Sequence, residues 1–251
     1  MSTNETYALE AEHLSIGYGE KVVQRDVCFG LRTGEMVCML GPNGCGKSTL
    51  LRTLAELQPA LGGSVHYKTQ ETGVARRLAL VLTERLSIDN TTVHDVVAMG
   101  RHPYTSFLGT LTAEDERIIA DSLNQVKYQL STVNDQLFNA LSDGEKQRVL
   151  IAKALAQQTP LILLDEPTAH LDLPNRILVL RLLRRLAHEE GKTVLISTHE
   201  LDLALQLSDR ILLMSPDGGG IRLDTADALI RNDAFRQAFS MDIFHPLADE
   251  E

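Results

Sequence analysis

The feature that most constrains this chain is a glycine-rich run that fits the pattern G-x-x-x-x-G-K-[ST]. It reads Gly41-Pro-Asn-Gly-Cys-Gly-Lys47-Ser48, after an apolar stretch over residues 35–40 and before a helical pattern over residues 47–57. The glycines let successive backbone N–H groups turn toward a phosphate, and the helix N-terminus adds a positive dipole. The sequence therefore predicts a phosphate-binding loop between a buried strand and a helix, as in α/β folds.

A second run supplies the acids that a nucleotide site needs. Residues 161–164 are four aliphatic residues that predict a central strand, and Asp165 and Glu166 follow at its C-terminal end, where α/β sheets bind ligands. Asp165 is expected to support Mg²⁺ together with the Ser48 hydroxyl, and Glu166 to polarise the attacking water. The residues expected around the phosphates are Gly41, Pro42, Asn43, Gly44, Cys45, Gly46, Lys47, Ser48 and Thr49.

Composition excludes several classes of protein. The chain has 251 residues, 24 Lys+Arg against 34 Asp+Glu, and a net charge of −10, which argues against non-specific nucleic-acid binding. No apolar run approaches the roughly 18 residues that cross a bilayer. The start lacks the pattern of a signal peptide, and the three cysteines follow neither a disulfide nor a metal-ligand spacing. We therefore expect a cytoplasmic compartment and no nucleic-acid partner.

The patterns along the chain predict one interrupted α/β domain. Strand patterns occupy residues 7–16, 21–31, 78–82, 161–164 and 193–197, and a helical pattern covers residues 175–188. Between them, Thr92 with Asp95 and Thr112 with Asp115 have the spacing of helix-start capping boxes. We expect an α/β core from residues 1–84 and 158–251, and a helical subdomain over residues 85–157.

The run Leu141-Ser-Asp-Gly-Glu145-Lys-Gln-Arg148 resembles the L-S-G-G-Q signature of ATP-binding-cassette (ABC) ATPases. The other cassette motifs stand in the family order, with Tyr18 before the phosphate loop and Asp172 and His199 after the two acids. The resemblance implies a P-loop ABC ATPase core with an N-terminal antiparallel β lobe and an inserted helical subdomain. It also implies hydrolysis of ATP with Mg²⁺.

The resemblance assigns roles residue by residue. Tyr18 would stack on adenine, His199 would contact the γ-phosphate, and Asp172 would act across a dimer interface. The signature residues Ser142, Asp143, Gly144 and Glu145 would contact ATP bound to a second copy of the chain in a head-to-tail pair. The S-x-x-E spacing of Ser142 and Glu145 itself predicts a helix N-terminus, which offers free N–H groups to an anion.

Two departures from the family pattern leave questions open. The family usually has a glutamine after the strand at residues 78–82 as a metal and water ligand, but Thr83 and Glu84 stand there. Either could supply an oxygen to Mg²⁺, and Glu84 is the expected ligand. In the signature, Asp143 and Glu145 replace Gly and Gln. We expect the Glu145 carboxylate to turn into the helix cap and leave the role of Asp143 open.

Cys45 stands out for its chemical environment. It lies within the phosphate loop beside Lys47 at a helix N-terminus, and such an environment lowers a thiol pKa. The sequence predicts that Cys45 reacts readily with alkylating reagents and that ATP protects it.

Residues 93–104 are similar to the V-x-x-x-V-x-x-G-R-x-P segment of ATPases that serve iron-siderophore, haem and vitamin B12 importers. This implies membrane permease subunits as partners, an external binding protein as an indirect one, and a peripheral location on the cytoplasmic face of the inner membrane. A groove beside residues 83–107 would hold the permease. The alternative is a soluble ABC ATPase such as one for iron–sulfur cluster assembly. A P-loop small-molecule kinase would not explain His199 or the signature.

Overall fold

The computed structural model describes residues 6–82, 90–106, 109–126, 136–216 and 218–239. Its largest element is a six-stranded sheet with the order β5-β6-β7-β3-β8-β9. The first five strands are parallel, and the last pair is antiparallel. These strands are β5 (Leu78–Val81), β6 (Leu161–Asp165), β7 (Thr193–Ser197), β3 (Met36–Leu40), β8 (Arg210–Met214) and β9 (Ile221–Asp224).

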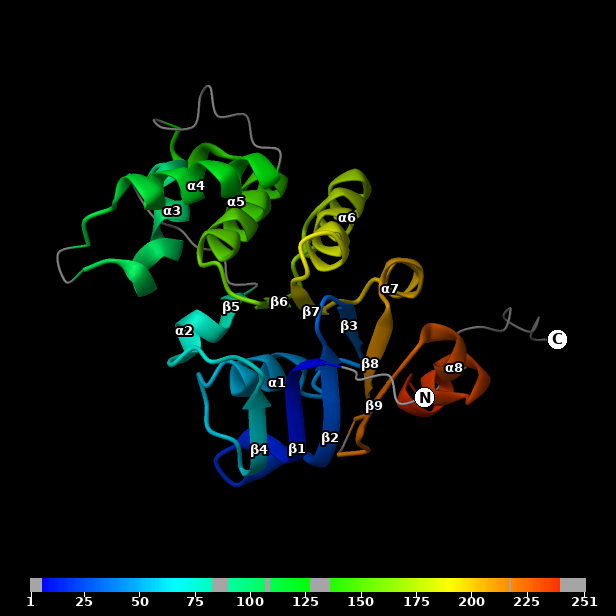
Figure 1. Cartoon of the computed structure of the whole chain (residues 1–251). Coiled ribbons are helices and arrows are strands. Elements are labelled where there is room, and N and C mark those ends of the chain that lie inside the picture. Colours follow the sequence, from blue (N-terminus) through cyan, green and yellow to red (C-terminus); the bar gives the residue numbers. More distant parts are fainter. Residues whose placement is uncertain (1–5, 83–89, 107–108, 127–135, 217, 240–251) are drawn as a thin grey trace.

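A second sheet is antiparallel and comes from the start of the chain. Its order is β2-β1-β4, with bounds β1 (Tyr7–Tyr18), β2 (Lys21–Arg32) and β4 (Gly62–Tyr67). Figure 1 shows this sheet below the parallel sheet, with α1 (Lys47–Leu54) beside it. The arrangement matches the predicted α/β fold class with an N-terminal antiparallel lobe.

The parallel strands are buried on both faces, which explains their unbroken apolar runs. Side chains alternate between faces along each strand, so Val37 and Met39 pack with α1 and the antiparallel sheet. Met36, Cys38 and Leu40 pack on the opposite face, in a core shared with the helices. The sheet therefore separates two cores and holds its strand ends rigidly at one edge.

The helices between β5 and β6 pack against one another away from the antiparallel sheet (Figure 1). They are α3 (Val93–Ala98), η1 (Met99–Tyr104), α4 (Ala113–Gln125), η3 (Phe138–Ala140) and α5 (Asp143–Ala156). Both predicted capping boxes are present, because Thr92 and Thr112 each exchange hydrogen bonds with the aspartate three residues on. The helical pattern of residues 118–126 is also confirmed, since Ile118, Ile119, Leu123 and Val126 are buried.

The remaining helices are α2 (Val74–Arg77), α6 (Leu173–His188), α7 (Leu201–Leu207), α8 (Ala226–Arg231) and α9 (Ala234–Phe239). The predicted helix over residues 47–57 ends earlier, at Leu54, and Glu56 takes a left-handed backbone conformation with φ 55°. None of the helices in the described ranges is long and apolar enough to cross a membrane.

Candidate functional site

The phosphate loop lies between β3 and α1, as its sequence predicts. Lys47 is buried, and its Nζ donates to the carbonyl oxygens of Gly41 at 2.8 Å and Pro42 at 3.2 Å. The Lys47 ammonium group therefore points back to the first residues of the phosphate loop. Gly46 has φ 105°, and a Cβ there would lie 2.6 Å from Cγ1 of Val23. Only glycine accommodates both the backbone conformation and this close approach.

Tyr18 ends β1 next to this loop. Its side chain is exposed, and its hydroxyl accepts a hydrogen bond of 2.8 Å from the Thr49 hydroxyl of α1. This bond orients the ring beside the start of the helix. An exposed ring face at this place is suited to stacking on a base.

The two predicted acids lie at the C-terminal end of β6 and meet the end of β7. The Ser197 hydroxyl donates to Oδ1 of the buried Asp165 at 2.6 Å and accepts from the Glu166 amide at 2.9 Å. Ser197 thus holds both residues in place. Sequence reasoning missed it, although a small polar residue at the end of an aliphatic strand is a usable signal.

Glu166 and His199 form the centre of the site. Oε1 of Glu166 lies 2.7 Å from Nε2 of His199, and both side chains are partly exposed. The Glu166 backbone has φ 47°, a conformation that costs roughly 1–3 kcal/mol and is found at functional sites. The structure therefore brings together a carboxylate and an imidazole that are 33 residues apart in the chain.

The signature begins α5 with the predicted capping box. The Glu145 carboxylate accepts from the Ser142 amide at 2.9 Å and from the Ser142 hydroxyl at 2.7 Å. These bonds hold the pKa of Glu145 below its ordinary value. The prediction that this carboxylate turns into the cap is confirmed, whereas Asp143 is simply exposed.

The start of α6 lies against the start of α5. Asp172 caps α6, because its Oδ1 accepts from the Asn175 amide at 3.1 Å and from the Asn175 side chain at 2.7 Å. A Cβ at Gly144 would lie 2.9 Å from Cγ of Asn175. The glycine in the signature therefore permits close contact between the two helix starts.

The environment predicted for Cys45, one that lowers its thiol pKa, is wrong. Its side chain is 2% exposed, and burial raises the pKa of the Cys45 thiol more than the nearby Lys47 lowers it. Cys45 belongs to the buried core that the antiparallel sheet shares with α1.

We expect alkylating reagents to label Cys45 more slowly than the exposed Cys28, because Cys45 is inaccessible and burial raises the pKa of its thiol. Peptide mapping after a time course with iodoacetamide measures both rates in one sample. Faster labelling of Cys45, suppressed by ATP, would restore the original prediction.

Gln24 is a second residue that sequence reasoning missed. It is fully buried, and its Nε2 donates to the carbonyls of Cys45 at 3.0 Å and Ser215 at 2.6 Å. Its Oε1 accepts from the Gly220 amide at 3.2 Å. One side chain thus joins β2, the phosphate loop and the β8–β9 hairpin. A lone glutamine among strand residues carries no sequence signal for this role.

We expect Gln24→Leu to destabilise the protein by about 1–3 kcal/mol, because it leaves buried backbone groups without partners. It should also raise the KM for ATP, since the loop loses an anchor at Cys45. Urea unfolding and ATPase kinetics measure the two effects. The same change at the exposed Gln70 is the control, and equal effects in both variants would contradict this role.

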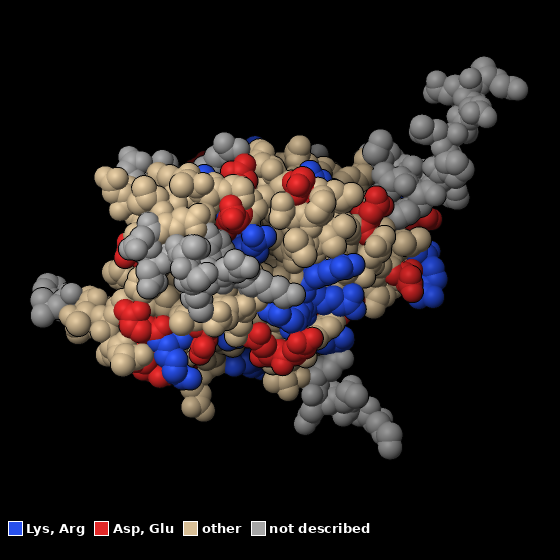
Figure 2. Space-filling model, turned by 90° about the horizontal axis from the view of Figure 1, so that it is seen from above, with Lys and Arg blue, Asp and Glu red and all other residues tan. Residues whose placement is uncertain are grey.

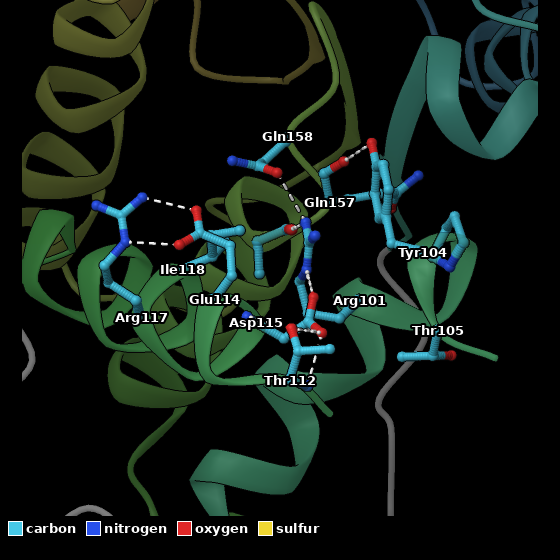
Figure 3. Close-up of polar contacts among 12 residues, drawn as sticks. Arg101, Tyr104, Thr105, Thr112, Glu114, Asp115, Arg117, Ile118, Gln157 and Gln158 are labelled. Atoms are coloured by element: carbon cyan, nitrogen blue, oxygen red, sulfur yellow. Dashed lines mark hydrogen bonds and ion pairs between the residues drawn. The ribbon is translucent and has the colours of Figure 1, made fainter. Parts of the chain in front are cut away.

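In the segment over residues 93–104, which is similar to importer ATPases, the arginine side chain is held by internal contacts (Figure 3). Arg101 is buried, and its Nε donates to Oδ1 of Asp115 at 2.8 Å. Its Nη1 donates to the Ala156 carbonyl at 2.7 Å and to the Gln158 side chain at 2.9 Å. A Cβ at Gly100 would lie 2.3 Å from the Lys153 carbonyl. This Gly-Arg pair therefore locks η1 and α4 onto the end of α5.

A cavity of about 170 Å³ lies beside this segment, between the end of β5 and α5. Its lining is mainly apolar, and burial lowers the pKa of Lys153 within it. Gln157, which lines the cavity, accepts a hydrogen bond of 2.9 Å at its carbonyl from the Tyr104 hydroxyl. The lining residues are Leu80, Val81, Leu82, Leu150, Lys153, Ala154 and Gln157.

The proposed metal ligands are only partly within the described ranges. Ser48 follows Lys47 at the start of α1, and Asp165 ends β6. A hydroxyl and a carboxylate are hard oxygen donors of the kind that Mg²⁺ prefers, so this pair fits the ion. Thr83 and Glu84 lie outside the described residues.

Comparisons with known proteins agree with this geometry. A family model described as ABC transporter matches residues 24–169. The iron(3+)-hydroxamate import ATP-binding protein FhuC of Bacillus subtilis (strain 168) is 36% identical over 241 residues, which cover 94% of this chain and 88% of FhuC. The hemin import ATP-binding protein HmuV of Thermobifida fusca (strain YX) is 36% identical over 219 residues, which cover 85% and 75% of the two chains.

Solved structures give the same picture. An ABC transporter solved in an inward-facing conformation superposes with a TM-score of 0.83 at 28% identity, covering 94% of this chain and 90% of the other. A dimeric ATP-binding cassette in a post-hydrolysis state, bound to ADP and Pi, superposes with a TM-score of 0.71 at 27% identity, covering 86% and 98%.

Proposed function

Because the chain belongs to the ABC transporter family and is an ATP-hydrolysing cassette, we propose that it drives import of an iron-siderophore, haem or cobalamin-type compound. The observation that carries this proposal is the similarity to import ATP-binding proteins such as FhuC over 94% of the chain. The segment over residues 93–104 supports the same group of importers.

We assign the chemistry of hydrolysis to the edge of the sheet where β3, β6 and β7 end. The loop N–H groups and Lys47 would bind the phosphates, and Tyr18 would stack on adenine. Glu166 would accept a proton from the attacking water, and His199, 2.7 Å away, would orient that carboxylate toward the γ-phosphate. Mg²⁺ held by Ser48 and Asp165 would neutralise charge on the phosphates.

The ATP-binding cassette bound to ADP and Pi, to which this chain is similar, is a dimer. For this chain we propose a head-to-tail pair of identical copies. The α5 N-terminus of one copy would present the Asp143 and Gly144 amides to the ATP of its partner, because the Ser142 amide is already bonded to the Glu145 carboxylate in the cap. Asp172, at the neighbouring start of α6, would link the two sites.

Residues 85–157 form the proposed helical subdomain, and 1–84 with 158–251 the proposed core. The 170 Å³ cavity at their border would receive a cytoplasmic segment of the permease, and its Leu and Val lining favours an apolar contact. The subunit would then sit peripherally on the cytoplasmic face of the inner membrane. It would act on the external binding protein only through the permease.

Glu84 is the proposed third metal ligand. We expect Glu84→Ala to raise the Mg²⁺ concentration needed for half-maximal ATPase activity, since it removes a hard oxygen donor. A Mg²⁺ titration of wild type, Glu84→Ala and Thr83→Ala measures this. An unchanged Mg²⁺ requirement in Glu84→Ala, with an increased one in Thr83→Ala, would transfer the role to Thr83.

Purification of the tagged chain from gently solubilised membranes tests the transport proposal. We expect a permease with several membrane-spanning helices to co-purify in about equal amount. Recovery only from the soluble fraction, with cytosolic partners, would contradict the importer proposal and leave the ATPase chemistry standing.

A further inference from the structure

A second cavity, of about 410 Å³, lies between the end of α4, α5 and the outer face of α6. None of its lining residues belongs to the phosphate loop, the two acids of β6 or the cavity at β5. The lining residues are Gln125, Val126, Arg148, Leu178, Arg181, Leu182 and Arg185.

Three of these residues are arginines that come from two helices. On α6, Leu178, Arg181, Leu182 and Arg185 are spaced i, i+3, i+4 and i+7, so they form one stripe along the helix. Arg148 faces them from α5. Figure 2 shows basic side chains gathered over α6 on this face of the molecule. The cavity is therefore positively charged although the whole chain has a net charge of −10.

These guanidinium groups have unused donors. The Nε atoms of Arg148 and Arg185 are buried and have no hydrogen-bond partner. Arg185 uses Nη2 to donate to the Gln125 carbonyl at 2.6 Å. Within the described ranges no carboxylate forms an ion pair with any of the three arginines of the cavity. Arg101 and Arg210, in contrast, each have a buried acidic partner. Buried donors without partners are costly, and an anion would satisfy them.

The chemistry of the lining defines the ligand. Guanidinium groups bind carboxylates and phosphates through paired hydrogen bonds, and three of them on two helices suit more than one anionic group. The leucines and Val126 suit a short carbon skeleton between those groups. The volume of about 410 Å³ lies in the range of small-molecule sites. We infer that this cavity binds a small organic polyanion that carries carboxylate or phosphate groups.

Calorimetric titration of the full chain with tricarballylate, a small tricarboxylate, tests this inference. Mg·ADP is present throughout to occupy the phosphate loop, so the probe reports on the second cavity. We expect saturable binding of one molecule per chain. Arg181→Gln should weaken it about tenfold or more, because it removes a charge-assisted hydrogen bond to the anion. Arg181 is exposed, so the variant should fold, and a thermal melt checks this.

Arg184→Gln is the matched control, because Arg184 lies on the same helix but does not line the cavity. It should leave the affinity unchanged. The absence of saturable binding would overturn the inference, as would equal losses in the two variants, which would indicate a general charge effect. The same titration is made with pyrophosphate and with an acidic peptide. Tighter binding of the peptide than of tricarballylate and pyrophosphate would also overturn the inference. The assay involves no turnover, so its failure is distinct from failure of the ATPase or importer proposal.

Discussion

Glu166→Gln should abolish ATP turnover while ATP binding remains. The substitution keeps the size of the side chain but removes the group that accepts a proton from water, and general-base catalysis typically contributes about 10²–10⁴-fold in rate. The phosphate loop is untouched, so the nucleotide affinity should change little. Because hydrolysis no longer separates the two copies, the variant should accumulate as a dimer in the presence of ATP.

Steady-state ATPase assays, equilibrium nucleotide binding and size-exclusion chromatography with and without ATP measure these effects. Glu189→Gln, at the exposed end of α6, makes the same chemical change outside the site and should behave as wild type. A wild-type rate of hydrolysis in Glu166→Gln would refute the proposed role of this carboxylate.

Arg101→Met should destabilise the protein by about 3–5 kcal/mol, the usual cost of breaking a buried ion pair on one side. The Arg101 and Asp115 side chains are 5% and 7% exposed, so the aspartate would keep a buried charge without its counterion. Urea unfolding measures the change. Arg117→Met is the matched control: its partner Glu114 lies on the same helix, but both side chains are more than half exposed. The control should lose little stability, because ion pairs between exposed side chains contribute little.

The loss in Arg101→Met should depend on pH. Hydrogen bonds from the Thr112 hydroxyl and amide, followed by the bond from Arg101, lower the pKa of Asp115 to about 2. An aspartate in an unfolded chain has a pKa of about 3.9. The stabilisation is therefore complete above about pH 4 and disappears as the pH falls through about 2. The Thr112 hydrogen bonds remain in Arg101→Met, so only the contribution of Arg101 is lost in the variant. The difference in stability between wild type and Arg101→Met should narrow as the pH falls through this interval, and a constant difference would contradict the ion-pair explanation.

The sequence by itself determined the features that depend only on residues close together in the chain. The glycines and Lys47 of the phosphate loop, the aliphatic strand before Asp165 and the three capping boxes act through neighbours within a few residues. Spacing alone therefore predicts their geometry. The ordered motifs from Tyr18 to His199 indicated the family for the same reason, since each motif is a short continuous segment.

Only the tertiary structure decided features that depend on burial or on distant partners. The position of Cys45 suggested a reactive thiol, but packing buries it and raises its pKa. Arg101 belongs to a segment expected at the permease groove, yet it is held internally by Asp115 and by carbonyl groups of α5. Gln24 and Ser197 join elements far apart in the sequence. Hydrogen bonds and desolvation depend on which groups meet in space, and no period or spacing along the chain carries that information.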